Sequence, residues 1–543
     1  MSGVLSNARP SSSILGGRLP VSETWQRPAD WLAMPAITPG SQRYVMLCAV
    51  WNGTSNYLRF NPIGTAYTVD WGDGSALENI ASDTPASHNF SWAGCSGSTL
   101  TSIGHRQAIV QVYPQSSGQF SALILNLKHA SAASGSSTPI LDFECSSPNA
   151  TLPQFTNGTV QSNYMQHFKA HSAFTPSAWS TQNFWSLLAM RQYEGLELSA
   201  PTSTIQAFYG NASLVQAPEL NTAGCSDMNN MFQACSRLVS VPAYDYSATS
   251  SVAGMFQNCF ALRTIGAMNT GNSTSFASTF AGCRALTSLP AVDTTKATTL
   301  QTAFTGCASL VTFPTLNTPA NLSLNNTFQG CTSMVTAPAM DTSKVTDMTS
   351  VFSGCTSLTS VPLYDTSKVT TASQMFQNCS SLRTIPLLDT SKVTVMSAMF
   401  LGCSALTAIP AFDLTACVTT TQMFWGTNVT SITALTNTSG IVTATQMFGN
   451  CLALQVVSIN LSGATSVANL FQTNLNMRSV TLTGLRYGFT VASNLLQASD
   501  LDALYTSLGT AVGAQTVTVT SNPGTTADTP SIATTKGWTV AGS

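Results

Sequence analysis

Apolar residues in the second half of the chain return at a fixed interval of 24 residues. The clearest position is a phenylalanine column, whose last step is 23 residues: Phe208, Phe232, Phe256, Phe280, Phe304, Phe328, Phe352, Phe376, Phe400, Phe424, Phe448 and Phe471. A cysteine column lies three residues further on: Cys235, Cys259, Cys283, Cys307, Cys331, Cys355, Cys379, Cys403 and, beyond Thr427, Cys451. A fixed period of this length indicates a solenoid, in which each repeat is one coil stacked on the next. We therefore predict that these two columns form the structural core of the repeats.

Within a repeat, the pattern predicts one short helix and one strand. A clean unit, MFQNCSSLRTIPLLDTSKVTVMSA, starts at Met375. At its end, apolar positions in residues 393–400 recur three to four residues apart, which predicts one or two helical turns that end at a left-handed residue such as Gly402. The segment IPLLD predicts a β-strand stacked on its neighbours. Because proline lacks an N–H donor, the backbone there must bend or turn that position outward.

The remainder of the chain divides by the spacing of its apolar runs and turn residues. Residues 1–42, rich in Pro, Ser and Gly, predict an extended N-terminal attachment arm. Short apolar runs in residues 43–115 predict a small β-sandwich, and residues 116–180 a connector with some strands. Residues 181–484 form the solenoid, and residues 485–543 a capping unit of helix and strand segments. The predicted fold class is mainly β with short helices: an elongated solenoid preceded by a small β-sandwich.

One apolar column next to the corner of each coil is the candidate ligand-binding surface. Its members are Tyr244, Met268, Val292, Leu316, Met340, Tyr364, Leu388 and Phe412. Counting by twos from Val361 through Leu363 places Tyr364 on the outward face of its strand. An apolar stripe that faces water marks a binding surface. The alternative is that the chain bends at Pro362 and returns this column to the core.

The aspartate that follows this column opens a DTSK motif at Asp341, Asp365 and Asp389. Such a carboxylate suits an Asx turn, in which it accepts backbone N–H groups. Carboxylates of adjacent coils also fall within the roughly 5 to 9.5 Å that a glycosidase requires. Turn capping is the more economical interpretation, because catalysis needs two carboxylates in one cleft and not one at every corner.

The low charge of the chain excludes two kinds of partner. Charged residues make up 8% of the sequence and the formal net charge is −2. Nucleic-acid binding is not expected, because no basic surplus is available to meet phosphates. Membrane insertion is not expected either, because no run of about 18 apolar residues occurs.

The cysteines and histidines carry no recognisable catalytic or metal-binding motif. Nine of the 14 cysteines lie in the column, where we expect buried free thiols, with disulfides or metal binding as the alternatives. His167 and His171 have the spacing of zinc ligands on a helix, and Asp70 and Asp73 of the WGDG turn have calcium-binding chemistry. A purely structural role is the other interpretation of each pair. We predict no catalytic residue, no metal and no cofactor.

The repeats resemble the BspA-type leucine-rich repeats of bacterial surface proteins, in which MFxxCxxLxxIPxxDTSKVT recurs. The resemblance covers residues 181–484 and is most specific in the three DTSKVT motifs. Upstream, YTVDWGDGS at 67–75 with SHNF at 87–90 is similar to the polycystic-kidney-disease (PKD) type of β-sandwich. The segment RPADWLAMP followed by this sandwich looks like the start of bacteriophage virion proteins.

These resemblances imply adhesion without catalysis. We expect a non-enzymatic virion structural protein, a tail fibre or surface appendage, whose adhesin-like rod serves host-surface recognition or assembly. The first residues lack the basic start and apolar run of a secretory signal. The implied partners are other virion proteins, bound through the N-terminal arm, and a host cell-surface glycan or protein; a phage fibre also implies a homotrimer. The alternatives are a bacterial cell-surface adhesin and a tailspike polysaccharide depolymerase.

Overall fold

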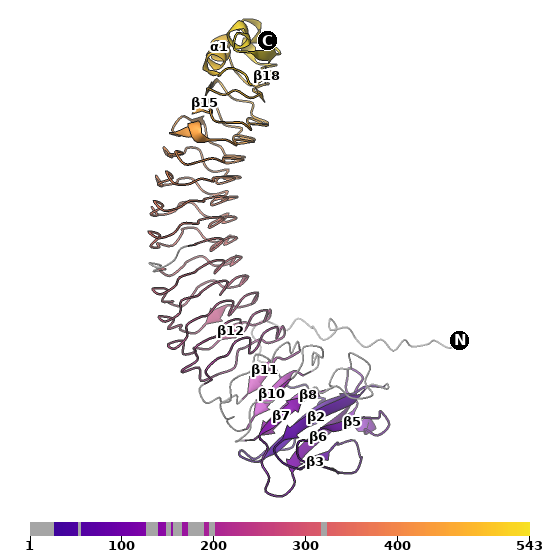
Figure 1. Ribbon diagram of the computed structural model, residues 1–543. Coiled ribbons are helices and arrows are strands. Elements are labelled where there is room, and N and C mark those ends of the chain that lie inside the picture. Colours follow the sequence, from indigo (N-terminus) through magenta and orange to yellow (C-terminus); the bar gives the residue numbers. More distant parts are fainter. Residues whose placement is uncertain are drawn as a thin grey trace, which may run out of the picture. The chain divides into compact units, whose positions relative to one another are not determined.

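The computed structural model divides into two compact units, Met1–Asn272 and Ser273–Ser543. The residues that it describes are 26–52, 56–125, 140–147, 154–155, 165–171, 189–194, 201–316 and 323–543. Figure 1 shows the strands of the first unit and the stacked coils of the second.

Two β-sheets form the N-terminal part of the first unit. The larger has the order β11-β10-β8-β1-β6-β3-β4, with β1 (Arg43–Val50), β3 (Tyr67–Asp70), β4 (Glu78–Ile80), β6 (Arg106–Pro114), β8 (Ile140–Ser146), β10 (His167–Ala170) and β11 (Gln192–Glu194). The smaller has the order β5-β2-β7-β9, with β2 (Tyr57–Ile63), β5 (Ala86–Asn89), β7 (Ala122–Leu125) and β9 (Gln154–Phe155); a 3-10 helix, η1 (Gly97–Thr99), precedes β6. The expected sandwich boundary at residue 115 is therefore wrong. Strands from the expected connector, residues 116–180, pair directly with β1 and β2 and complete both sheets.

Strand β1 is buried on both faces, which explains its nearly continuous apolar sequence. On the inner face, Tyr44 stacks on Phe120 at 4.8 Å between ring centroids. On the outer face, Trp31 packs against Leu47 and Ala49. Part of the expected attachment arm therefore docks onto the sheet of its own chain, because Trp31 has an apolar surface to cover there. Residues 1–25 lie outside the described residues.

The parallel stacking of the chain begins inside the larger sheet. Strands β8, β10 and β11 are parallel, and Asp142 pairs with His167 and His167 with Gln192, a spacing of 25 residues. On the opposite face, Phe143 contacts Phe168 at 5.4 Å and Phe168 contacts Tyr193 at 6.3 Å between ring centroids. Tyr193 in turn contacts Phe208, the first phenylalanine of the solenoid column, at 5.1 Å between ring centroids, so the aromatic contacts of the solenoid continue into the larger sheet. The expected solenoid start at residue 181 lies outside the described residues.

Turns replace the expected helix in the coils, so that expectation is wrong. Some backbone N–H groups donate to carbonyl oxygens of the next coil and others to carbonyl oxygens of their own coil. The N–H of Phe400 donates to the Met423 oxygen at 2.9 Å, and that of Cys403 to the Phe400 oxygen at 3.0 Å. Ala398 and Gly402 adopt left-handed φ angles of 53° and 73°. An α-helix cannot pass through these residues, because it requires right-handed φ and ψ at every position.

Regular strands are confined to a few coils. They are β12 (Ser240–Val241) and β13 (Thr264–Ile265) in the first unit, and β14 (Ser431–Ile432), β15 (Val456–Asn460) and β16 (Ser479–Thr483) in the second, with the 3-10 helix η2 (Thr438–Gly440) between β14 and β15. Between residues 323 and 430, neighbouring coils share only isolated bridges, such as Asp347 with Thr371. The five-residue strands β15 and β16 appear where Ser458 and Thr481 replace the proline of earlier coils. This agrees with the expectation that proline prevents ordinary pairing.

The core of the coils is a stack of parallel phenylalanine rings. In the second unit, Phe304 and Phe328 lie 5.5 Å apart between centroids with an interplanar angle of 4°, and Phe400 and Phe424 lie 5.6 Å apart at 11°. All 14 cysteines are free and buried. The predicted core columns therefore face inward, and the fold class is confirmed as a mainly β solenoid preceded by a β-sandwich.

A non-repetitive unit follows Gly484. It comprises β17 (Phe489–Thr490), α1 (Ala498–Ser507), β18 (Gln515–Thr518), η3 (Pro523–Thr526), α2 (Ser531–Thr534) and β19 (Trp538–Ala541). The Lys536 ammonium donates to the backbone oxygens of Tyr505, Thr506 and Leu508, which satisfies carbonyls at the end of α1. Figure 1 places α1 and β18 beside the C-terminus. Within the described ranges, no helix has both the length and the apolar character needed to cross a bilayer.

Candidate functional site

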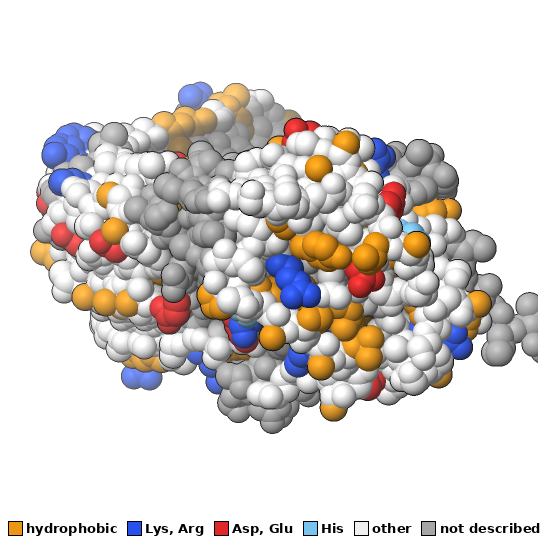
Figure 2. Space-filling view, turned by 90° about the horizontal axis from the view of Figure 1, so that it is seen from below, with side chains coloured by type: hydrophobic (Ala, Val, Ile, Leu, Met, Phe, Trp, Pro, Cys, Tyr) orange, Lys and Arg blue, Asp and Glu red, His pale blue; other side chains and the backbone are white. Residues whose placement is uncertain are grey.

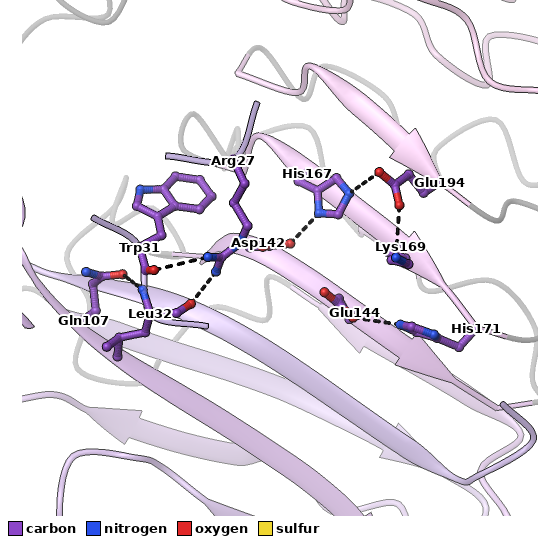
Figure 3. A network of polar contacts seen from close by, with 10 residues as sticks. All are labelled: Arg27, Trp31, Leu32, Gln107, Asp142, Glu144, His167, Lys169, His171 and Glu194. Carbon is purple, nitrogen blue, oxygen red and sulfur yellow. Dashed lines mark hydrogen bonds and ion pairs between the residues drawn. The ribbon is translucent and has the colours of Figure 1, made fainter. Parts of the chain in front are cut away.

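Six ionisable side chains lie on one face of the parallel strands β8, β10 and β11 (Figure 3). We call this set the charged strand face; it consists of Asp142, Glu144, His167, Lys169, His171 and Glu194. Alternate residues of a strand share a face, and the parallel register aligns the three strands. In a chain with 8% charged residues, this concentration is unusual. On the face drawn in Figure 2, charged side chains are scattered among a larger number of uncharged ones.

Asp142 is the centre of the charged strand face. Its side chain has 0% exposure and bonds to Arg27 Nε at 2.8 Å and to His167 Nδ1 at 2.7 Å. The other nitrogen of His167 lies 3.4 Å from Glu194, which in turn pairs with Lys169 at 3.2 Å. A buried carboxylate needs such partners to offset its lost hydration. Arg27 also donates to the backbone oxygens of Trp31 and Leu32, so this network holds the N-terminal segment against the sheet.

The alternative of zinc ligands on a helix is not supported, because His167 and His171 lie at a strand and not on a helix. His171 Nε2 bonds to Glu144 at 2.7 Å, and His167 is engaged by Asp142. Within the part of the chain that the structure describes, no three His, Cys, Asp or Glu side chains are grouped as metal ligands. The charged strand face was not predicted from the sequence, because its side chains come from strands 25 residues apart that carry no repeated motif.

The turn at residues 70–75, which contains the WGDG motif, uses both of its carboxylates within the fold. Asp70 accepts from the Gly72 N–H at 3.0 Å, and Asp73 bonds to His88 Nε2 at 2.8 Å. Burial raises the pKa of Asp73, but hydrogen bonds from His88 and Ser75 outweigh it, so that the pKa lies below its ordinary value. These contacts favour the structural interpretation of the turn over calcium binding.

The predicted ligand-binding column faces the core, which overturns that prediction. Met340 is half-buried, and the seven other members are buried: Tyr244, Met268, Val292, Leu316, Tyr364, Leu388 and Phe412. Tyr364 stacks on Phe352 at 6.1 Å, and its hydroxyl donates to the Pro338 oxygen at 2.8 Å. Counting by twos fails here, because side chains alternate only along an extended strand and these segments are not strands.

In each coil, the residue that faces outward is the one that directly precedes this buried column. On two neighbouring coils that residue is a leucine. Leu363 is 71% exposed and Leu387 is 60% exposed. The equivalent residues Ala291, Ala339 and Ala411 are also exposed but small. We call Leu363 and Leu387 the leucine pair. The sequence could have indicated this pair, since leucine stands there at a repeat position that is otherwise occupied by small residues.

Beside the leucine pair, the corner aspartates act as turn acceptors, as predicted. Asp365 accepts from the Ser367 backbone N–H at 3.0 Å and from its hydroxyl at 2.7 Å, and Asp389 makes the same bonds to Ser391. The hydroxyl and N–H of Ser367 hold the pKa of Asp365 below its ordinary value, and Lys368 adds to this. The corner is therefore an exposed row of fixed charges of both signs.

A comparison with protein families gives a match over the repeats. The family described as "Mycoplasma protein of unknown function, DUF285" matches residues 202–315, 322–437 and 383–481, which together span half of the chain. The chain belongs to this family. This membership agrees with the resemblance to BspA-type repeats. No curated protein matches the chain.

Solved structures with similarity to the chain include three receptor complexes. The TLR13–ssRNA13 complex is 13% identical with a TM-score of 0.18, covering 72% of this chain and 63% of that chain. The plant peptide hormone receptor RGFR1 with RGF2 is 12% identical with a TM-score of 0.18, covering 75% and 67%. The Toll–Spatzle complex of Drosophila is 11% identical with a TM-score of 0.17, covering 74% and 64%. The chain thus spans less than two thirds of the TLR13 and Toll chains.

Proposed function

We propose that this protein is a non-enzymatic binding protein whose solenoid attaches to a host surface through its outward columns. The observation that supports this is the leucine pair, because two large apolar side chains stand in water on adjacent coils at 71% and 60% exposure. Burial of each leucine side chain by a partner contributes about 1.5 to 3 kcal/mol to the free energy of binding. A partner that covers both therefore gains affinity at no cost to the fold.

The charges beside the leucine pair suit a binding role. Asp365 and Asp389 are ionised at neutral pH, since their pKa values lie below the ordinary value, and Lys368 and Lys392 follow three residues later. Exposed charges around an apolar centre contribute orientation and specificity. A depolymerase is less well supported, because the same carboxylates are engaged as turn acceptors.

We further propose that the protein is carried on a phage particle. This rests on the resemblance of RPADWLAMP and the PKD-like WGDG sandwich to virion proteins. Arg27, Trp31 and Leu32 contact the sheet of their own chain, so attachment to other virion proteins is proposed for residues 1–25. Immunogold electron microscopy with an antibody against residues 323–543 tests this: label on a tail or fibre supports it, and label confined to a cell envelope favours the bacterial adhesin. Sedimentation of the full chain tests the proposed homotrimer.

Adhesion is tested by flow cytometry of the fluorescently labelled full chain on bacterial cells from the source sample. The double variant Leu363→Ser, Leu387→Ser is expected to reduce binding by about tenfold or more. The matched control is Val418→Ser, Val442→Ser, two exposed apolar residues on adjacent coils at 44% and 38% exposure. An equal loss in both double variants, or no binding by the unaltered chain, contradicts the proposal.

A further inference from the structure

In the second unit, the indole ring of Trp425 lies over Gly449 of the next coil. A Cβ atom added to Gly449 would stand 2.1 Å from both Cε3 and Cζ3 of Trp425. The ring therefore occupies the space that a side chain at position 449 would fill. Gly449 has no left-handed φ, so the backbone conformation does not require glycine there. The absence of a side chain instead lets the indole lie against the coil, where it is half-buried.

A row of bonded amides lies on the same turns of these coils, where the Trp425 backbone N–H donates to the Gln422 backbone oxygen at 3.1 Å. The Gln422 Nε2 donates to the Gln446 Oε1 at 2.8 Å, and the Gln446 Nε2 donates to the Gln472 Oε1 at 3.0 Å. Gln472 follows Trp425 and Gly449 at the same position of successive coils. Each amide carries two N–H donors and one oxygen acceptor, so this chain of bonds leaves further donors and acceptors along the row. We call Trp425, Gln422, Gln446 and Gln472 the Trp–Gln platform.

The surroundings of the Trp–Gln platform carry no formal charge along the sequence. Between Asp413 and Arg478 there is no Asp, Glu, Lys, Arg or His. The two cysteines of this stretch, Cys417 and Cys451, are buried, and burial raises the pKa of each thiol to about 11. An ionic ligand thus finds no counter-charge on these coils, and the chemistry that they offer is one aromatic face with uncharged donors and acceptors.

We propose that the Trp–Gln platform binds a neutral saccharide. A pyranose has an apolar face of C–H groups and a rim of hydroxyl groups, and an indole and planar amides carried on the same turns offer groups complementary to both. The inference rests on the proposed function, since it assigns a ligand class to the same solenoid. It concerns coils other than those of the leucine pair, so the two surfaces can be tested separately.

The experiment uses the full chain labelled with 5-fluorotryptophan. Trp425 is the only tryptophan between Trp185 and Trp538, and Trp425→Phe identifies its fluorine resonance among those of the nine tryptophans. The probes are the methyl glycosides of glucose, galactose and N-acetylglucosamine, and maltotetraose. We expect a saturable shift of the Trp425 resonance with at least one of them, while the others stay constant. No shift up to about 50 mM, beyond the Kd of a weak single-site complex, overturns the proposal.

Two variants separate binding from a packing role of the ring. Gly449→Ser displaces the indole without removing it and is expected to weaken binding about tenfold, and Gln446→Ala by about fivefold. Unchanged affinity in both variants overturns the proposal. Cell binding by the Gly449→Ser variant completes the test. If it equals that of the unaltered chain and no glycoside shifts the resonance, the saccharide site is refuted while adhesion stands. A resonance shift in the unaltered chain, together with no cell binding by that same unaltered chain, refutes adhesion alone.

Discussion

The thiol of Cys355 donates a hydrogen bond to the backbone oxygen of Phe328 on the preceding coil, at 3.1 Å. The same bond recurs from Cys307 to Phe280, Cys331 to Phe304, Cys379 to Phe352 and Cys403 to Phe376. The two columns that define the repeat are therefore bonded to each other across every one of these junctions. A cysteine suits this position because it packs as a small apolar side chain and also offers a donor to a buried carbonyl.

The thiols are expected to resist modification in the folded protein. Burial raises the pKa of Cys307, Cys355 and Cys403 to about 12, and the thiolate is the reactive form. With Ellman's reagent at about pH 8, we expect almost no reaction of the native chain and reaction of all 14 thiols after denaturation. Rapid labelling of several thiols in the native chain, or fewer than 14 after denaturation without reductant, contradicts the free, buried column.

Truncation of a stacked ring is expected to be strongly destabilising. Phe352 lies between Phe328 at 5.6 Å and Phe376 at 5.7 Å, and Phe352→Ala leaves a cavity that both rings border. The expected loss is about 3 to 5 kcal/mol in the free energy of unfolding, measured with guanidinium. The control, Leu387→Ala, removes an exposed side chain and is expected to change this energy by less than about 0.5 kcal/mol. Similar losses for the two variants contradict the assignment of core and surface.

The corner aspartates predict a loss of stability in acid. Their pKa values are depressed in the folded chain, so their contribution is present above the ordinary value of 3.8 and is lost as the pH falls through the folded value. We expect a constant thermal midpoint from about pH 7 to 5 and a fall below about pH 4. Asp365→Asn is expected to reduce the slope of that fall. A midpoint that rises on acidification contradicts the turn-capping role.

Removal of the Asp142 charge is expected to release the N-terminal segment. Asp142→Asn leaves Arg27 and His167 without their carboxylate, at a cost of about 3 kcal/mol. Hydrogen exchange measured by mass spectrometry is expected to show lost protection in residues 26–34. The matched control is Glu144→Gln, which affects His171 on the same face. Equal loss of protection in both variants contradicts the role of Asp142 in holding the N-terminal segment against the sheet.

The sequence predicted those features of the candidate sites that depend on local chemistry. The Asx turn at Asp365 is an example, because the acceptor and its donors lie two residues apart. The outward position was predicted wrongly at Leu363 and Tyr364, since the direction of a side chain depends on whether its backbone is extended. The bond between Arg27 and Asp142 was not predicted from the sequence, because the two residues lie 115 positions apart in the chain. A contact across that distance leaves no periodic signal.

By itself, the sequence determined the solenoid: a 24-residue period places the same residue type at the same point of each coil, and identical side chains then stack, as Phe304 and Phe328 do. It also determined the turns, whose bonds are local. Only the tertiary structure decided which column faces water, where parallel stacking begins, and that Trp31 covers its own sheet. These depend on backbone bending and on contacts between distant segments, which residue order alone does not specify.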